Sequence, residues 1–124
     1  MARAIVITAG HVTAEARLND SKTAGAIWDA LPIEATGETW GDEIYFDIRL
    51  TAAPESPKET VESGDLGYWP PGRAFCIFFG PTPMSRGDEI RPASAVNVVG
   101  RVVGDPKVFQ TVRAGARVTL RRAS

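Results

Sequence analysis

The chain has 124 residues, with 14 basic and 15 acidic side chains spread along it, so its net charge is −1. This length suits one domain, 1–124, that buries a core without disulfides or metals. The near-neutral balance, without a basic block, gives nucleic-acid binding no support. No apolar run approaches the roughly 18 residues of a membrane span, and the apolar start is too short for a signal peptide. We therefore expect no membrane partner and a cytoplasmic location.

Alternating apolar and polar residues predict a hairpin at the start of the chain. Its strands are Ala2–Thr8 and His11–Leu18, joined by a turn at Ala9-Gly10. A short helix over 24–31 follows, ended by Pro32, because four apolar residues recur at helical spacing: Ala24, Ile27, Trp28 and Leu31. We expect this helix to plug one end of a barrel, with Trp28 in the core.

Three later segments predict strands from the same alternation. Glu43–Thr51 has four residues expected to face inward, Ile44, Phe46, Ile48 and Leu50, while Glu43 and Tyr45 face outward. In Ala93–Val103, Val96, Val98 and Val102 are expected to share one face, and Gly100 fits a bulge or a close backbone approach. Arg117–Arg121 is the last strand, with its basic residues on a solvated face. Ile33–Glu38 is a weaker strand candidate.

The most apolar run, Ala74–Phe79, lies between Pro70-Pro71-Gly72 and Gly80-Pro81. A short apolar run bounded by Gly and Pro is typical of a strand buried on both faces. Phe75, Ile77 and Phe79 then share one face, and Cys76 and Phe78 share the other.

Seven or eight short strands and little helix predict a mainly β fold. A second short helix begins at Asp105-Pro106 and packs Val108, Phe109 and Val112 inward. We expect a closed antiparallel β-barrel with one or two short capping helices.

Few residues offer covalent or metal chemistry. Cys76 is the only cysteine and is expected to be a buried structural thiol, and His11 is the only histidine and is expected to be solvated. The carboxylates show no metal-ligand spacing, and no nucleotide-binding glycine pattern occurs. We therefore expect no metal, no cofactor and no identifiable catalytic residue.

Aromatic rings near a few hydrogen-bonding groups predict a pocket for a small ligand or peptide. Tyr45 and Asn97 alternate with core residues, and Trp69 precedes a proline that favours an extended backbone. The alternative is that these rings complete packing under loops. The predicted ligand-binding residues are Glu43, Tyr45, Tyr68, Trp69, Phe79, Thr82, Met84, Ser85 and Asn97.

Three segments carry a family resemblance: TWGDEIYF (39–46), GDLGYWPPGRAFCIFFGPTPMS (64–85) and RPASAVNVVG (91–100). Together they resemble the small prokaryotic cyclophilin-like family, single-domain β-barrels related in fold to the cyclophilin prolyl isomerases. The resemblance implies a cyclophilin-like barrel, in which Phe78-Phe79 match the Phe pair beside the proline pocket. The chain departs from cyclophilins because it lacks the catalytic arginine motif and the Trp and His that follow the Phe pair.

Three functions remain open at this point. The first is a binding module that holds a small molecule or short peptide in a groove lined by aromatics. The alternative is a weak or specialised peptidyl-prolyl cis-trans isomerase, for which Arg49, Arg73, Arg86 or Arg91 would have to replace the missing arginine. A third is a structural or assembly protein, and an outward edge strand would favour a homodimer.

Overall fold

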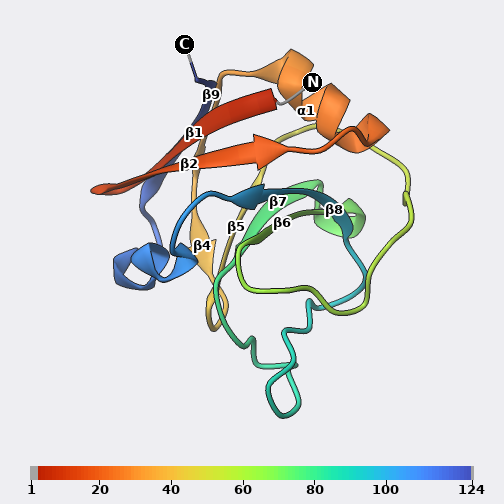
Figure 1. Cartoon of the computed structure of the whole chain (residues 1–124), viewed down its shortest axis with the longest axis vertical. Helices are drawn as coiled ribbons and strands as arrows, with labels where there is room; N and C mark the ends of the chain where they lie inside the picture. Colours follow the sequence, from red (N-terminus) through yellow and green to blue (C-terminus); the bar gives the residue numbers. More distant parts are fainter. Residues whose placement is uncertain (1–2, 124) are drawn as a thin grey trace.

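The computed structural model describes residues 3–123, so Ala2, where the first strand was predicted to begin, lies outside the described part. Figure 1 shows the elements along these residues. The described strands are β1 (Arg3–Ala9), β2 (Val12–Leu18), β3 (Ile33–Thr36), β4 (Glu38–Thr39), β5 (Glu43–Asp47), β6 (Asp65–Trp69), β7 (Ala74–Phe78), β8 (Asn97–Val102) and β9 (Arg117–Arg122). The helices are α1 (Lys22–Ala30) and the short 3₁₀-helices η1 (Pro70–Gly72) and η2 (Pro106–Thr111).

All nine described strands form one sheet, in the order β3-β9-β1-β2-β8-β6-β7-β5-β4. Each pairing in it is antiparallel, and β1 and β2 form the predicted hairpin. The first and last strands in this order, β3 and β4, follow one another in the chain, so the sheet curls round on itself. β3 pairs with β9 at one edge, and β4 pairs with β5 at the other. Gly37 separates β3 from β4, and a Cβ there would lie 2.9 Å from Cγ2 of Val118. The predicted mainly β antiparallel barrel is confirmed, in a nearly closed form.

Two short helices lie on opposite sides of the barrel (Figure 1). Ser21 caps α1 by accepting a hydrogen bond from the Ala24 amide, and Ala24 and Ile27 join the barrel core. Trp28, predicted to be core, is half-buried, and the guanidinium of Arg122 lies 4.4 Å from its ring centroid.

The second helix, η2, buries Phe109 against the ring of Phe79, with 6.1 Å between the centroids. Val108 is 44% exposed, so its predicted inward orientation is wrong. The element is a 3₁₀-helix, whose turns are tighter than those of an α-helix. Adjacent residues of it point in different directions, so Phe109 faces the core while Val108 faces solvent.

β5 ends earlier than predicted, at Asp47 rather than Thr51. Arg49 adopts a left-handed backbone with φ of 56°, and its amide donates to Oδ1 of Asp47 at 2.7 Å. The chain therefore turns away from the sheet, although Ile48 stays buried and Leu50 half-buried.

β8 is also shorter than predicted and contains a bulge. Leu66 pairs with Gly100 and Gly67 pairs with Val98, which leaves Val99 as an extra residue. The bulge shifts the alternation, so Val99 is buried in the barrel core while Val98 is only half-buried, contrary to the prediction. The predicted close approach at Gly100 is confirmed, since a Cβ there would lie 2.2 Å from the carbonyl oxygen of Arg17.

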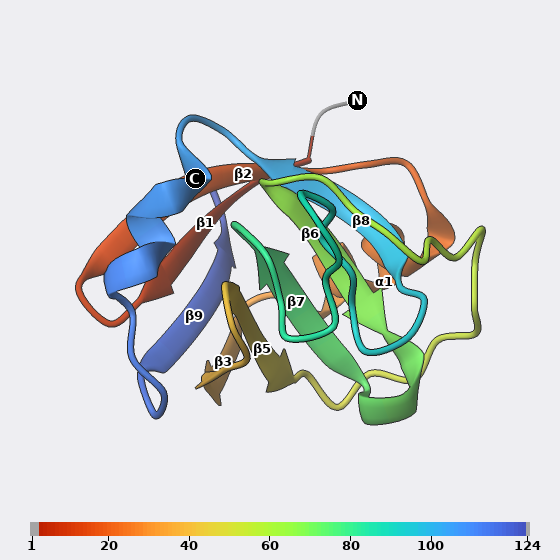
Figure 2. The ribbon, with the colours of Figure 1, turned by 90° about the horizontal axis from the view of Figure 1, so that it is seen from below.

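The described structure has a second, smaller apolar layer outside the barrel. Phe75 and Ile77 of β7 belong to the barrel core, whereas Cys76 and Phe78 pack outside it with Ile90 and other residues. All five residues of β7 are buried, as predicted. The outer face is covered by the segment 79–96, which crosses over β6 and β7 in Figure 2.

Replacing Phe46 tests whether its side chain is part of the barrel core. Its side chain is 2% exposed and its ring stacks on Phe75 at 5.4 Å between centroids. We expect Phe46→Ala to lower the free energy of unfolding by about 3–5 kcal/mol, because it removes a buried ring and leaves a cavity. Urea unfolding measures this, with Val108→Ala as an exposed control expected to cost below about 1 kcal/mol. Equal costs for the two variants would contradict the placement of Phe46.

Candidate functional site

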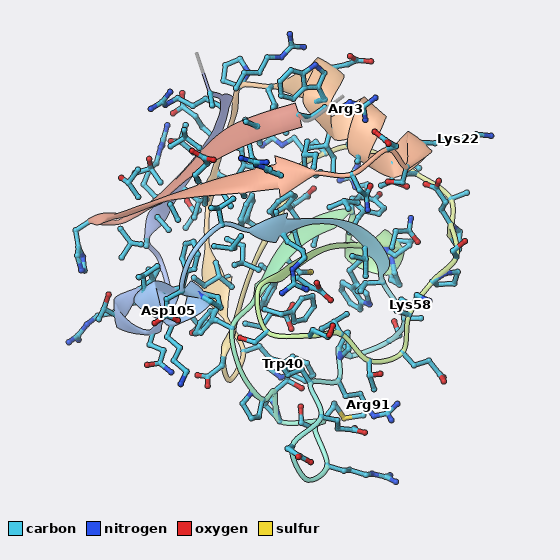
Figure 3. All side chains as sticks on the ribbon, viewed as in Figure 1. Arg3, Lys22, Trp40, Lys58, Arg91 and Asp105 are labelled. Carbon is cyan, nitrogen blue, oxygen red and sulfur yellow. The ribbon has the colours of Figure 1, made fainter. Side chains whose placement is uncertain are left out.

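A cavity of about 280 Å³ lies between the outer face of the barrel and the segment that covers it. The outward side chains of β5 and β7 form its floor, and the loops before β5 and before β8 form its walls. In Figure 3, Trp40 lies beside the loop that carries Arg91, at the end of the molecule away from Lys22 of α1. The lining residues are Trp40, Glu43, Tyr45, Trp69, Cys76, Pro92, Ala93 and Val96.

Strand register explains why the floor residues point outward. Tyr45 of β5 pairs with Cys76 of β7, two positions from the pair of Glu43 with Phe78. Since successive side chains of a strand point to opposite faces, these four share the outer face. Ile44, between Glu43 and Tyr45, is in the barrel core.

Backbone contacts hold the covering segment in place at both ends. At its start, the Asp42 amide donates to the Pro81 carbonyl at 2.9 Å, and the Phe79 amide donates to the Asp42 carbonyl at 3.0 Å. Gly41, with φ of +60°, permits this approach, since a Cβ there would lie 2.9 Å from the Pro81 oxygen. At its far end, Val96 and Lys58 exchange two backbone hydrogen bonds. These contacts define the walls of the cavity.

The two tryptophans of the cavity are positioned by local contacts. Nε1 of Trp69 donates to Oγ of Ser94 at 2.6 Å, and Gly72 packs beneath its ring, where a Cβ would lie 2.7 Å away. The amide of Trp40 donates to the carbonyl of Glu43 at 2.9 Å. Trp40, Tyr45 and Trp69 are each half-buried, so part of every ring remains accessible.

This environment strongly affects Glu43, an ionisable residue on the cavity floor. Its side chain is 5% exposed, and its Oε1 atom is buried without a hydrogen-bond partner among residues 3–123. Burial raises the pKa of Glu43 to about 7, while the neighbouring Cys76 thiol, as a donor, acts in the opposite direction. Burial, and next the charge of Glu43, raise the pKa of Cys76 well above its ordinary value, so this thiol stays protonated.

The structure brings three of the nine predicted site residues together at the cavity: Glu43, Tyr45 and Trp69. Tyr68 and Phe79 instead belong to the barrel core, at 0% and 4% exposed. The Tyr68 hydroxyl donates to the Leu50 carbonyl and accepts from the Ala52 amide, so it holds the segment after β5.

Asn97 was predicted to point away from the core, but it pairs with Tyr68 of β6 and so shares the face of that barrel-core residue. It lies beneath the segment after β5, where it is 1% exposed. Its amide nitrogen donates to Oγ1 of Thr23 at 3.1 Å and to the carbonyl of Ala53 at 3.0 Å, and its Oδ1 accepts from the Glu55 amide at 2.8 Å. Asn97 therefore links β8, α1 and this segment, and contributes to their packing.

The last three predicted residues lie within the covering segment. Oγ1 of Thr82 donates to the Arg91 carbonyl, and Oγ of Ser85 accepts from the amides of Thr82 and Arg91 at 2.9 and 3.0 Å. Met84 is 49% exposed at the surface. Thr82 and Ser85 therefore fix the shape of the loop, while Met84 points to solvent.

Five lining residues were not predicted: Trp40, Cys76, Pro92, Ala93 and Val96. For Cys76 and Trp40 the sequence held a usable signal. Cys76 was assigned to the face of β7 opposite Phe75, and strand pairing places that face beside Tyr45. Trp40, between Gly37 and Gly41, directly follows β4 and lies three residues before the start of β5. Pro92 and Ala93 depend on how the long loop folds back, for which alternation gives no signal.

Other chemistry is sparse in the described part of the chain. Residues 3–123 contain no group of three or more His, Cys, Asp or Glu side chains placed to hold a metal ion. His11 lies at the surface, with Nε2 3.3 Å from Oγ1 of Thr111. No helix among these residues is long and apolar enough to cross a membrane.

The raised pKa of Glu43 makes a prediction for stability. Its ordinary pKa is 4.5 and its folded pKa is about 7, so the folded state binds this proton more tightly. Stability from this group is therefore complete below pH 4.5 and is lost as the pH rises towards 7, by on the order of 3 kcal/mol. Urea unfolding at pH 5 and pH 8 should show Glu43→Gln gaining stability relative to the unmodified protein at the higher pH. An unchanged difference between the two proteins would contradict the burial of an ionisable Glu43.

Comparison with known proteins agrees with this architecture. The family model described as "Cyclophilin-like" matches residues 3–121. The solution structure of a hypothetical protein from Archaeoglobus fulgidus is similar, with 42% sequence identity and a TM-score of 0.83, over 98% of this chain and 95% of that one. A search of curated proteins gives no match. The chain belongs to the cyclophilin-like family.

Proposed function

We propose that the protein binds a small molecule or the end of a short peptide in the cavity between β5, β7 and the covering segment. The observation that carries this proposal is Oε1 of Glu43, which is buried at the cavity without a partner in the described part of the chain. Buried polar atoms are nearly always hydrogen-bonded in folded proteins, and an unsatisfied one costs about 1–3 kcal/mol. A ligand with a hydrogen-bond donor would remove that cost.

The remaining lining supports the same function. Two tryptophans and a tyrosine give flat apolar surfaces that remain partly accessible, and Pro92 and Val96 add further apolar contacts. A mostly apolar pocket with one or a few fixed polar groups is typical of small-ligand sites. A volume of about 280 Å³ accommodates a single ring with a short substituent.

The same cavity gives little support to prolyl isomerisation. In that reaction a donor must be aimed at the twisting amide, and no arginine is among the described residues that line the cavity. Arg73 pairs with Asp47 at 3.4 Å, and Arg91 pairs with Glu89 at 2.6 Å. Arg49 lines a different cavity, between β3 and the end of β5. We therefore keep the isomerase as the alternative and favour binding without turnover.

We predict no substantial acceleration of cis/trans exchange in standard Xaa-Pro peptides. The physical reason is that no arginine lines the cavity, among the described residues, to donate to the twisting amide. A peptide isomerisation assay measures this, with an ordinary cyclophilin as the positive control. A rate comparable to that control, abolished by replacing one of Arg49, Arg73, Arg86 or Arg91, would establish the alternative.

Binding is tested by the indole N–H signals of the three tryptophans in an NMR fragment screen. Trp40 and Trp69 line the cavity, whereas Trp28 lies on α1 and serves as an internal control. We expect single-ring fragments that carry a donor to shift the Trp40 and Trp69 signals and leave Trp28 unchanged.

A blocking variant sharpens this test. Ala93→Phe places a ring at the cavity wall and should abolish the shifts, because the ring occupies the space a fragment would take. Ala114→Phe, in the exposed turn before β9, is the matched control and should leave them intact. Fragments that shift all three tryptophans equally, or that still bind after Ala93→Phe, would contradict binding in this cavity.

A further inference from the structure

We propose that the ligand of this cavity is a cation, a protonated or methylated amine, which pairs with the carboxylate of Glu43 between the rings of Trp40, Tyr45 and Trp69. This inference rests on the proposed binding function and names the class of ligand. The observation behind it is that Glu43 is buried and that no Lys or Arg is among the described residues lining its cavity.

Five other acidic residues of the described chain have positively charged partners within it. Asp65 pairs with Arg101 at 2.8 Å, Glu89 pairs with Arg91 at 2.6 Å, and Glu34 pairs with Arg117. Glu43, at 5% exposed, is about as buried as Asp65, at 7%, yet none of the described residues that line its cavity is Lys or Arg. A nearby opposite charge favours the charged form of a carboxyl group, so a bound cation would supply the positive charge that the described lining residues lack.

The walls of the cavity also suit a cation. The face of an aromatic ring attracts positive charge, and the attraction is larger for tryptophan than for phenylalanine or tyrosine. Trp40, Tyr45 and Trp69 surround the same cavity as Glu43. Such a contact occurs elsewhere in the described chain, where the guanidinium of Arg122 lies 4.4 Å from the ring centroid of Trp28. Several rings around one carboxylate form a cage in which an ammonium group is stabilised both by the ring faces and by the carboxylate.

Protonation of Glu43 would control this binding. Besides Glu43, the titratable residues that line the cavity are Tyr45 from β5 and Cys76 from β7, and the loops contribute Trp40, Pro92 and Ala93. Because burial raises the pKa of Glu43 to about 7, the carboxyl is protonated at lower pH and then carries no charge to pair with an amine. Affinity for a cation should therefore rise with pH up to about 7, by about tenfold per unit below that value, and then level off.

The test compares three ligands of one shape and different charge: benzylamine, benzyl alcohol and benzoate. Their dissociation constants are measured at pH 8 from the indole signals of Trp40 and Trp69, and Trp28 reports that each variant is folded. We expect benzylamine to bind at least about tenfold more tightly than benzyl alcohol, and benzoate to bind least. At pH 5.5 the advantage of benzylamine over benzyl alcohol should largely disappear.

Two variants assign the effect to Glu43. Glu43→Gln keeps the shape and removes the charge, so benzylamine should lose its advantage over benzyl alcohol at pH 8. Glu34→Gln removes an exposed acid on β3 and should leave that advantage unchanged. Phe-Gly-Gly-amide and its N-acetyl form test whether the amine is the N-terminus of a peptide. A site that accepts a peptide N-terminus binds the first, which carries a free amine, and not the second, in which that amine is acetylated.

Each contrary outcome has a separate meaning. If benzyl alcohol binds as tightly as benzylamine at pH 8, the cavity binds ligands but does not select a cation, and the inference is overturned while the proposed function stands. The same holds if Glu43→Gln keeps the preference. If none of the three ligands shifts Trp40 and Trp69, and the wider fragment screen also finds none, the proposed function fails and the inference fails with it.

Discussion

The burial of β7 on both faces is the constraint on which the rest of the structure depends. Its inward residues, Phe75 among them, fill the barrel, and its outward residues, Cys76 and Phe78, would meet solvent if the protein were only a barrel. Burying that outer face is favourable by about 25 cal/mol per Å² of apolar surface, so the segment 79–96 folds across it. Gly67 of β6 makes room, because a Cβ there would lie 3.1 Å from both the Phe78 ring and Val96. The cover leaves a space beside Glu43, and this space is the cavity.

Glu43 therefore owes its chemistry to the same burial. A carboxyl at that position of β5 faces outward, which on an uncovered barrel would mean solvent, but the covering segment reduces its exposure to 5%. Its pKa rises because the charged form loses hydration, and no cation among the lining residues compensates for that loss. Electrostatic interactions are stronger where water is excluded. The Glu43 carboxylate therefore lowers the stability of the protein at neutral pH and, for the same reason, interacts strongly with a suitable ligand. The proposed binding function and the predicted pH dependence of stability follow from one cause.

The fold could be predicted from the sequence to a large extent, because alternation and Gly/Pro turns are local signals. The β1–β2 hairpin, α1 and the two faces of β7 were all predicted from spacing alone. The errors lie where geometry departs from regular alternation: the bulge at Val99, the left-handed turn at Arg49 and the 3₁₀ turn that exposes Val108.

The site was predicted less completely, for a related reason. Outward orientation on a strand identified Glu43 and Tyr45. The same rule failed for Asn97, because the bulge in β8 shifts the alternation and places it on the face of Tyr68, where it binds the backbone of the segment after β5. Which loop covers which face is set by contacts between residues far apart in the chain, and these leave no periodic trace in the sequence. The most direct measurement of the central claim is the pKa of the Glu43 carboxyl by ¹³C NMR, with Glu43→Gln used to assign the signal. A value of about 7 is expected, and a value near the ordinary 4.5 would contradict the burial of this carboxyl beneath the covering segment.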